Sequence, residues 1–326
     1  MLLLLLFQPG AISLAGAAEQ RVSLSQGWNA VFLEVQPTKR IPNQLFRGTP
    51  ISRVASHFPT QNTVEYISDP GEVAWKKEGW GIWYAPGRPD AFLSSLFSIQ
   101  GNRSYLVYSE SAYEWRVEGD PNFLPHAWKA NSYNLVGFSL DPDSPPTFEK
   151  FFEGSRAHRD LKIYRLVDGR WRKLTDPRAT SMAAGEAFWI YCEGKSNYQG
   201  PLHVSFAGIA RQGLLFGPAS GAATLQVVNQ GPDPFDIVFE TEGDLVLMLA
   251  IKSLQESRDT IRNLSVPLDG RETMSDFAPA AKFALTLQVD RGEMTESVQT
   301  GLLTITTSMG TRHYVPMAAA RPALSE

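Results

Sequence analysis

The sequence is poor in cysteine, in long apolar runs and in charge of one sign. Its 326 residues contain one cysteine, Cys192, so no disulfide can form within the chain. Lys+Arg 30 against Asp+Glu 34 leaves a net charge of −4, which gives no electrostatic signature of nucleic-acid binding. Hydrophobic residues make up 43% and charged residues 20%, a globular composition that excludes a disordered or fibrous chain.

Motifs of the common catalytic and cofactor sites are also missing. The chain has no G-x-S-x-G, H-E-x-x-H, P-loop or G-x-G-x-x-G motif. Its five histidines have no second ligand at metal-binding spacing, so we expect no metal site and no cofactor. Asp141 and Asp143 follow an expected strand and fit turn chemistry, with a calcium loop as the alternative.

Residues 1–18 have the pattern of a secretory signal. Residues 2–7 are apolar and Pro9-Gly10 interrupts them, so the run is shorter than the roughly 20 residues that span a membrane. Ala15-Gly16-Ala17 fits the small-x-small cleavage pattern. A basic n-region is missing, so we expect the true start to lie upstream or the gene start to be cut short. A buried N-terminal helix is the alternative interpretation.

An exported chain of this size with a single cysteine is typical of bacteria, because a large core replaces disulfides. We therefore expect the protein in the periplasm, at the cell surface or outside the cell. No later apolar run is long enough to span a membrane. Cys192 lies in an apolar run and is expected to be a buried hydrophobic residue.

The chain contains an internal repeat with an offset of about 105 residues. Residues 24–37 read LSQGWNAVFLEVQP, and residues 129–142 read KANSYNLVGFSLDP. Both segments have an aromatic-Asn pair, an alternating apolar run and a closing proline. Further correspondences follow in the same order along the chain: 45–48 with 151–154, 64–67 with 161–164, Trp75 with Trp171, and 101–108 with 185–191.

Each repeat is expected to consist of strands around one short helix. Residues 30–35 alternate and are rich in β-formers, which predicts a strand. Prolines open the expected helices at 42–46 and 145–152. The first repeat has an insertion at residues 79–97, which includes Trp80, Trp83 and an expected helix at 90–97.

The last third of the chain has a different composition, because all eight tryptophans lie between Trp28 and Trp189. From residue 206 the pattern predicts about seven short strands with turns between them, typical of an Ig-like or fibronectin-like β-sandwich. The fold class is thus mainly β, with two diverged β-rich repeats, short helices and a C-terminal sandwich. We expect the domains 1–18 (signal), 19–120 (repeat 1), 121–205 (repeat 2) and 206–326 (sandwich).

The phrase at residues 27–37, GWNAVFLEVQP, resembles a motif of exported bacterial surface and secreted proteins with repeated Gly-Trp-Asn-Leu-Val-type β-rich modules followed by an Ig-like domain. Residues 185–190, GEAFWI, are similar to the strand that closes such a module. The resemblance covers residues 22–204 and implies a surface or secreted protein. It brings no catalytic residues, and residues 101–108 depart from the pattern because they lack tryptophan.

The densest aromatic cluster lies in the insertion of the first repeat. Trp80, Trp83 and Tyr84 have no counterpart in the second repeat, and Arg88 follows them. Aromatic faces on loops suit sugar rings or protein hot spots, so these four residues are the candidate ligand-binding site. Core packing of the insertion is the alternative, and binding requires both tryptophan rings to be exposed.

Three functions remain open from the sequence. The first is a non-enzymatic exported protein for adhesion, surface assembly or scaffolding, with a protein or glycan partner at the cell surface. The second is a carbohydrate-binding module or accessory protein of polysaccharide processing that uses the aromatic cluster. The third is a hydrolase with a pocket at the repeat interface, which requires two converging carboxylates or a Ser/His pair.

Overall fold

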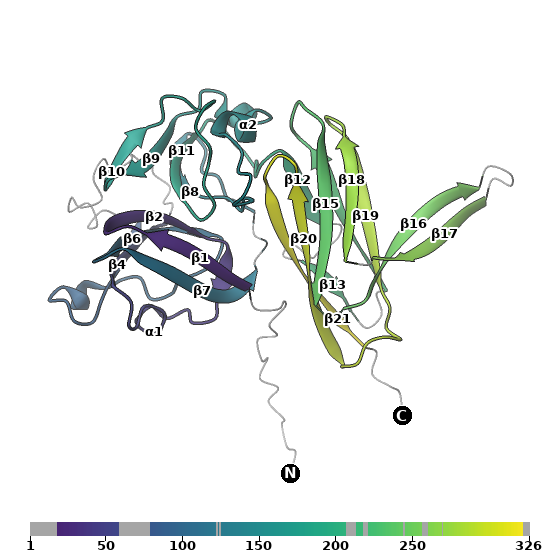
Figure 1. Ribbon diagram of the computed structural model, residues 1–326, viewed down its shortest axis with the longest axis horizontal. Coiled ribbons are helices and arrows are strands. Elements are labelled where there is room, and N and C mark those ends of the chain that lie inside the picture. The colour runs from purple at the N-terminus through teal and green to yellow at the C-terminus, as the bar shows by residue number, and fades with distance from the viewer. Residues whose placement is uncertain are drawn as a thin grey trace, which may run out of the picture.

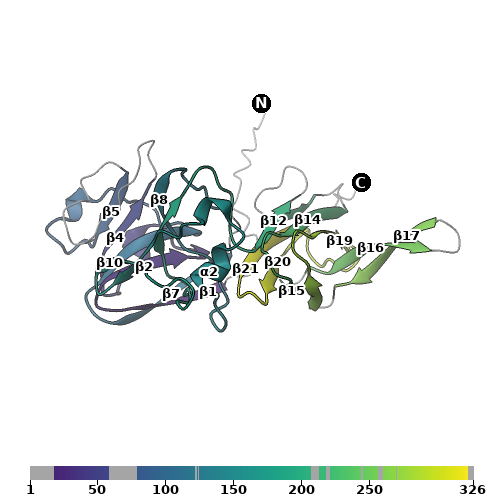
Figure 2. The same cartoon turned by 90° about the horizontal axis from the view of Figure 1, so that it is seen from above.

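The computed structural model describes residues 18–58, 79–121, 123, 125–206, 213–217, 221–243, 245–255, 260–268 and 270–321, and the expected signal segment lies almost wholly outside them. The protein is mainly β, and the described strands form five sheets. Repeat 1 (18–121) and repeat 2 (125–200) lie one above the other, and the sandwich (202–321) lies beside them (Figures 1 and 2). The expected fold class is confirmed.

Repeat 1 is a two-layer β structure with its own core. Alternate residues of the two facing sheets fill the space between the layers, including Val31, Leu33 and Trp115. Helix α1 (Pro42–Leu45) carries its proline in the first turn, as expected. The first sheet has the order β1 (Ala18–Leu24), β7 (Tyr113–Pro121), β3 (Val35–Pro37), and the second has the order β2 (Gly27–Leu33), β6 (Arg103–Ser109), β4 (Ile51–His57), β5 (Trp80–Tyr84).

Repeat 2 is one sheet with a helix packed on its inner face. The strand order is β8 (Ser132–Val136), β11 (Phe188–Cys192), β9 (Ile163–Val167), β10 (Arg170–Lys173). Helix α2 (Phe148–Phe152) starts after Thr147, whose hydroxyl accepts a hydrogen bond from the Lys150 backbone N–H at 3.3 Å. Phe148 of this helix meets Phe188 of β11 edge to face, with ring centroids 4.9 Å apart.

The two repeats share one strand order, because β2-β6-β4-β5 matches β8-β11-β9-β10 position by position. This order corrects two expected correspondences. The strand that matches β9 is β4, not residues 64–67, and β5 matches β10. Trp80 lies opposite His57 as Trp171 lies opposite Leu166, so Trp80 rather than Trp75 is the counterpart of Trp171.

The observed correspondences differ from the expected ones because the additional residues of repeat 1 come between β4 and β5. Strands β9 and β10 are joined by the two-residue turn Asp168-Gly169, where both residues have positive φ of 50° and 73°. Strands β4 and β5 are instead joined by residues 58–79. The insertion of repeat 1 therefore precedes β5 and does not contain it. Residues 64–67 and Trp75 lie outside the described residues.

An asparagine fixes the start of β2 in repeat 1 and of the matching strand β8 in repeat 2. The Asn29 amide accepts from the Ser25 N–H at 2.9 Å and donates to the Ser25 and Gly27 carbonyls at 2.9 and 3.0 Å. Asn134 does the same, accepting from the Lys129 N–H at 2.8 Å and donating to the Lys129 and Ser132 carbonyls at 3.1 and 2.9 Å. The repeated aromatic-Asn pair of the sequence thus has a structural cause.

The outer faces of the two four-stranded sheets pack against each other. Trp189 and Ala187 of repeat 2 pack with Phe32 of repeat 1 in one buried cluster. The two repeats are also joined by backbone hydrogen bonds, since the Phe32 N–H donates to the Gly185 carbonyl at 2.8 Å. A Cβ on Gly137 would lie 2.2 Å from the Phe32 Cβ, so the absence of a side chain there lets the sheets approach.

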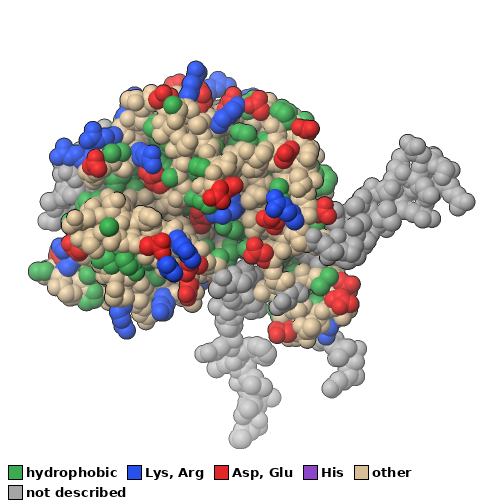
Figure 3. Space-filling model, viewed as in Figure 1, with side chains coloured by type: hydrophobic (Ala, Val, Ile, Leu, Met, Phe, Trp, Pro, Cys, Tyr) green, Lys and Arg blue, Asp and Glu red, His purple; other side chains and the backbone are tan. Residues whose placement is uncertain are grey.

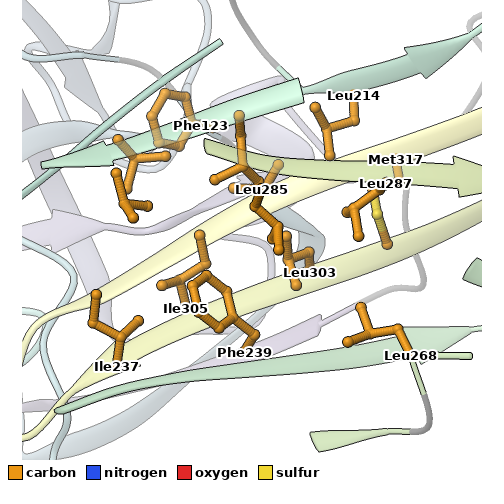
Figure 4. Close-up of a cluster of buried hydrophobic side chains, with 14 of the residues drawn as sticks. Phe123, Leu214, Ile237, Phe239, Leu268, Leu285, Leu287, Leu303, Ile305 and Met317 are labelled. Carbon is orange, nitrogen blue, oxygen red and sulfur yellow. The ribbon is translucent and has the colours of Figure 1, made fainter. Parts of the chain in front are cut away.

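The sandwich consists of two five-stranded sheets around one apolar core, with Phe239, Leu285 and Leu303 between the layers (Figure 4). The hairpin β16–β17 extends away from it in both views (Figures 1 and 2). One sheet has the order β12 (Leu202–Phe206), β14 (Ala222–Asn229), β19 (Lys282–Val289), β16 (Leu247–Gln255), β17 (Thr260–Pro267). The other has the order β13 (Leu214–Phe216), β21 (Arg312–Ala320), β20 (Val298–Thr307), β15 (Phe235–Gly243), β18 (Arg271–Phe277).

Three sandwich strands, β18, β13 and β12, were not expected from the sequence. β18 is polar and mostly exposed, and β13 has only three residues and pairs parallel to β21. Strand β12 crosses the expected boundary at 205/206 and pairs with β14.

The sandwich is joined to both repeats. Arg312 of β21 forms an ion pair with Glu34 of repeat 1 at 3.0 Å, and Glu34 is only 5% exposed. Leu140 of repeat 2 forms an isolated bridge with Thr311. Phe123, between the repeats, is part of the sandwich core.

Candidate functional site

Trp80 packs inside the contact between the two repeats. Its ring lies 6.1 Å from the Trp189 ring and 5.2 Å from the His57 ring, both in edge-to-face geometry. Its counterpart Trp171 meets Trp189 from repeat 2 at 6.3 Å. Burial in this aromatic cluster lowers the pKa of His57 to about 4, so the imidazole is neutral at pH 7. The position of Trp80 is that of a repeated packing residue.

Trp83 lies in the core of repeat 1 and is only 4% exposed. Its indole N–H donates to the Asn43 side-chain oxygen at 2.7 Å, and its ring lies 4.8 Å from Phe46. A cavity of about 430 Å³ reaches this ring from the α1 side. The expected condition that both tryptophan rings be exposed is not met, because alternation along β5 turns Trp83 inward.

Tyr84 and Arg88 lie together at the end of β5, with the Arg88 guanidinium 6.0 Å from the Tyr84 ring. Arg88 is held by Asp90 through two bonds of 2.9 and 3.0 Å, so its charge is matched locally. The expected helix at 90–97 is only the 3₁₀ turn η2 (Ala91–Leu93). The ligand-binding role of Trp80, Trp83, Tyr84 and Arg88 stays a prediction.

Tyr84 belongs to a row of side chains across the outer face of the sheet in repeat 1. The strand register places Trp28, Tyr108, Arg53 and Tyr84 side by side on β2, β6, β4 and β5. The Trp28 and Tyr108 rings meet edge to face at 5.3 Å. The Arg53 guanidinium lies 3.8 Å from the Tyr108 ring centre and 5.1 Å from that of Trp28. We call these four residues the aromatic–arginine row.

Arg53 is the unusual member of this row. Among the residues that the structure describes, none of the ion pairs includes its guanidinium. Its Nε is buried and has no hydrogen-bond partner in the described part of the chain. A buried donor without a partner costs free energy.

Repeat 2 carries a matching arrangement of two aromatic rings and a cation. Tyr133 and Tyr191 meet edge to face at 5.2 Å, as Trp28 and Tyr108 do. The Lys162 ammonium lies 4.9 Å from the Tyr191 ring centre. Tyr191 on β11 holds the place of Tyr108 on β6. The Lys162 carbonyl accepts from the Tyr191 N–H at 3.0 Å, so Lys162 lies beside Tyr191 as Arg53 lies beside Tyr108.

Trp28 and Tyr108 form part of the wall of a groove at the junction of the repeats. The groove has a volume of about 930 Å³ and opens to solvent between β1–β2 of repeat 1 and the β9–β10 hairpin of repeat 2. Its wall combines aromatic, hydroxyl, amide and charged groups: Arg21, Val22, Ser23, Ser25, Gln26, Gly27, Trp28, Asn29, Ala30, Val31, Tyr108, Arg165, Leu166, Val167, Asp168, Gly169, Arg170, Ala183, Ala184, Gly185, Glu186. We call this cavity the repeat groove.

Two carboxylates, Glu186 and Asp168, line the repeat groove. Glu186 is held by Arg165 through two bonds of 2.7 Å, although burial still raises the pKa of Glu186. The other lining carboxylate, Asp168, sits in an exposed turn. No histidine or cysteine is among the lining residues, so the wall offers no Ser/His pair.

The sequence offered a signal for Trp28 but not for the groove. Trp28 stands in the repeated Gly-Trp-Asn motif, and the motif alone does not show which face its ring occupies. Arg53 and Tyr108 carry no motif, and only strand register brings them beside Trp28.

Two negative observations apply to the described residues. None of the helices within the described ranges is long and apolar enough to cross a bilayer. In the same ranges, His, Cys, Asp and Glu side chains do not gather in threes at a place that could hold a metal ion. Basic and acidic side chains are interspersed over the face in Figure 3.

No protein-family model matches the chain, and no curated protein matches it. Among solved structures, a FixG-related protein from Vibrio parahaemolyticus is 15% identical and covers 37% of this chain and 96% of its own, with a TM-score of 0.23. The chaperone–tip adhesion subunit complex CsuC-CsuE of Acinetobacter baumannii is 16% identical and covers 33% and 53%, with a TM-score of 0.20.

The Enterococcus faecalis MSCRAMM ACE, which binds its ligands by the collagen hug model, is 8% identical and covers 94% and 90%, with a TM-score of 0.23. Likenesses of this size establish no shared overall fold.

Proposed function

We propose that the chain is a non-enzymatic exported bacterial protein for adhesion or surface assembly, and that it binds its partner in the repeat groove. The observation that carries the proposal is the composition of the groove wall. An open cavity of about 930 Å³ with an aromatic pair and dispersed hydroxyl and amide groups suits an extended ligand.

The state of the lining carboxylates supports binding over hydrolysis. A glycoside hydrolase needs one carboxyl group as acid and a second as base or nucleophile across the cleft. Glu186 is engaged on both oxygens by Arg165. A carboxylate fixed in this way holds the β9 side of the groove in place and is poorly suited to accept or deliver a proton.

The wall also favours a second candidate function, a carbohydrate-binding module or accessory protein of polysaccharide processing. Trp28 is half-buried and lines the groove, and aromatic rings commonly pack on sugar faces. Both candidates use the same groove and differ in the ligand that fills it.

The test is to fill the groove. Ala183 and Ala184 both line it, but only Ala184 also packs on the core of repeat 2, so Ala183 is the position to enlarge. We expect Ala183→Trp to abolish binding of the purified mature protein to a glycan array and to intact bacterial cells. Ala179→Trp, at an exposed position outside the lining, is the matched control and should bind as the native protein does.

Two results would contradict the proposal. One is unchanged binding by the Ala183→Trp protein, which would place the binding surface elsewhere. The other is cleavage of a bound glycan during incubation, seen as shorter chains on chromatography, which would make the protein a hydrolase.

A further inference from the structure

We infer that one end of repeat 1 inserts four apolar side chains into an anionic phospholipid bilayer, so that the protein lies on a membrane surface. The four side chains are those of Ile41, Phe92, Leu93 and Phe97, and we call them the apolar tip. None of them lines the repeat groove, so the inference goes beyond the proposed function. It depends on the exposure of the tip, on the way its loop is held and on the charges beside it.

The apolar tip is far more exposed than large apolar side chains usually are. Phe92 is 82% exposed and Phe97 is 74% exposed, while Leu93 and Ile41 are 53% and 52% exposed. A single exposed leucine is ordinary, but a group that includes two exposed phenylalanines marks an interaction surface. The tip therefore needs a partner that offers an apolar environment.

Two segments of repeat 1 carry the apolar tip, residues 38–50 around α1 and residues 85–99 after β5. The Ile99 N–H donates to the Arg40 carbonyl at 2.8 Å, which brings tip residues of both segments to one contact. The two segments also line one cavity of about 430 Å³ beside Trp83. In both views the blue segment that contains η2 lies at the end of repeat 1 far from the sandwich (Figures 1 and 2).

The loop that carries the two phenylalanines is fixed on β5. The Ile82 carbonyl accepts from the Ser95 and Leu96 N–H groups at 2.7 and 3.0 Å. The Ser94 hydroxyl accepts from the Tyr84 N–H at 3.0 Å, and the Ser95 hydroxyl accepts from the Ile82 N–H at 3.1 Å. These bonds cover the outer edge of β5 and close it to an added strand. They also hold the tip in place before it meets a partner, which lowers the cost of binding.

The segment around α1 is basic. Residues 38–50 contain Lys39, Arg40 and Arg47 and no acidic residue, and all three cations are exposed. None of the ion pairs among the described residues includes them. In the segment after β5, the one cation and the one acid pair with each other. The two segments together therefore carry a positive charge.

Acids of neighbouring strands do not cancel this charge. Glu110 and Glu118 each share one backbone hydrogen bond with the basic segment. Arg103 adds a cation beside β5, because its guanidinium lies 4.7 Å from the ring centre of Phe58, and that ring lies against Gly81. The cations without an ion pair therefore outnumber the acids at this end of repeat 1.

A bilayer fits this end of repeat 1 better than a protein partner does. Apolar side chains bordered by cations match an anionic membrane, in which acyl chains lie beneath phosphate headgroups. Lysine and arginine side chains are long enough to reach the headgroups while the tip enters the acyl layer. A stable protein interface draws on about 20–30 residues from each partner, whereas the tip offers four apolar side chains.

The experiment measures sedimentation of the purified mature protein with lipid vesicles. One set consists of phosphatidylcholine alone, and the other also contains phosphatidylglycerol, which is anionic. We expect the native protein to bind the anionic vesicles at least about 10-fold more tightly, because each cation near an anionic surface strengthens binding about 5-fold. Sodium chloride should reduce this difference, because it screens the surface charge.

Variants of the tip test the apolar contact. Phe92→Ser combined with Phe97→Ser should weaken binding to anionic vesicles about 10- to 100-fold, because two rings no longer enter the acyl layer. Leu93→Ser and Leu215→Ser are a matched pair, since these leucines are 53% and 56% exposed and only Leu93 belongs to the tip. We expect a loss of about 3- to 10-fold for Leu93→Ser and no change for Leu215→Ser. Thermal melting checks that each variant folds.

Variants of the basic segment test the charge. Arg40→Gln combined with Arg47→Gln should weaken binding to anionic vesicles about 10- to 30-fold and leave binding to neutral vesicles unchanged. The control is Arg159→Gln combined with Lys195→Gln, at two exposed cations of repeat 2, which should bind as the native protein does.

The outcomes separate this inference from the proposed function. No binding of the native protein to anionic vesicles, equal binding to both kinds of vesicle, or equal losses in Leu93→Ser and Leu215→Ser would overturn the inference. A native dimer that becomes a monomer in the Phe92→Ser, Phe97→Ser protein, seen by light scattering, would assign the tip to a second copy instead. The Ala183→Trp protein should bind vesicles as the native protein does, and the tip variants should keep native binding to the glycan array and to cells. Each proposal can therefore fail while the other stands.

Discussion

At the scale of single residues, the two asparagines of the repeated motif explain why the motif recurs. Asn29 and Asn134 each use oxygen and nitrogen to hold the backbone of the loop before a strand. A side chain that satisfies three backbone groups replaces bonds that a turn would otherwise need. Asn134 is 5% exposed, so water cannot take over its bonds.

We predict that Asn134→Ala lowers the free energy of unfolding by about 2–4 kcal/mol, because it leaves several buried backbone groups without partners. Asn29→Ala should cost less, since Asn29 is half-exposed. Urea unfolding measures both. Asn197→Ala, at an exposed position, is the control and should change stability by under about 0.5 kcal/mol. Similar values for all three variants would show that the amides do not hold the loops.

At the scale of elements, tryptophan side chains from both repeats form the contact between the two four-stranded sheets. Trp80 of β5 and Trp171 of β10 approach Trp189 from opposite repeats. The two strands occupy the same place in their sheets, so one packing solution is used twice. Gly137 permits the close approach, since a side chain there would collide with Phe32.

We predict that Trp80→Ala and Trp171→Ala each lower stability by about 3–5 kcal/mol, the usual cost of an aromatic ring removed from a packed site. The double variant should cost less than the sum, because both rings contact Trp189. Chemical unfolding of the four proteins gives the coupling. Phe92→Ala, at a side chain 82% exposed, should be neutral. A neutral Trp80→Ala would show that Trp80 does not stabilise the contact between the two sheets.

At the scale of the whole molecule, a buried ion pair joins the sandwich to repeat 1. Burial raises the pKa of Glu34, and Arg312 acts against this shift. Arg312 is therefore needed to keep the carboxylate charged at the junction. Removing one partner of a buried pair costs more than removing both.

We predict that Arg312→Met lowers stability by about 3–5 kcal/mol at pH 7, and that Glu34→Gln added to it restores most of the loss. The loss of stability in Arg312→Met should be smaller at pH 5 than at pH 7, because protonation of the Glu34 carboxyl group removes its unpaired negative charge. Urea unfolding at pH 7 and pH 5 measures both effects. A double variant as unstable as the single one would show that the pair does not hold the junction.

Buried histidines make the whole molecule sensitive to acid. Burial lowers the pKa of His158 and His313 to about 4, below the value of 6.5 in an unfolded chain. Between pH 6.5 and 4 the unfolded chain thus binds more protons, and stability falls as pH falls. Each histidine should contribute about 1.4 kcal/mol per pH unit in this window. Glu34 and Glu186, with raised pKa values, act in the opposite direction.

We expect denaturant unfolding between pH 7 and 4.5 to show this loss, and His158→Gln to reduce the slope by about 1.4 kcal/mol per pH unit. Arg159→Gln, at the exposed neighbouring position, should keep the native slope. A slope unchanged in His158→Gln would mean that His158 is protonated in the folded protein.

The sequence by itself determined the β class, the duplication and the short helices. Alternation of apolar residues reports which face of a strand is buried, and proline, asparagine and glycine report where strands and helices begin. These signals are local, so the strand expected at residues 30–35 overlaps β2, and the helices expected at 42–46 and 145–152 contain α1 and α2. Cys192, expected to be buried, is fully buried.

Only the tertiary structure decided which aromatic residues have counterparts and what covers them. Residues 58–79 separate β4 from β5. Comparison of the two repeats in sequence therefore aligns Trp171 with Trp75, whereas the strand register aligns Trp171 with Trp80. Alternation cannot say whether the outer face of a sheet meets water or a second sheet, so the sequence does not show that Trp80 packs against repeat 2. The repeat groove joins residues 21–31 to residues 165–186, and strand register brings Tyr108 beside Trp28 in its wall. Contacts between segments this far apart depend on how the sheets pack, which no local pattern records.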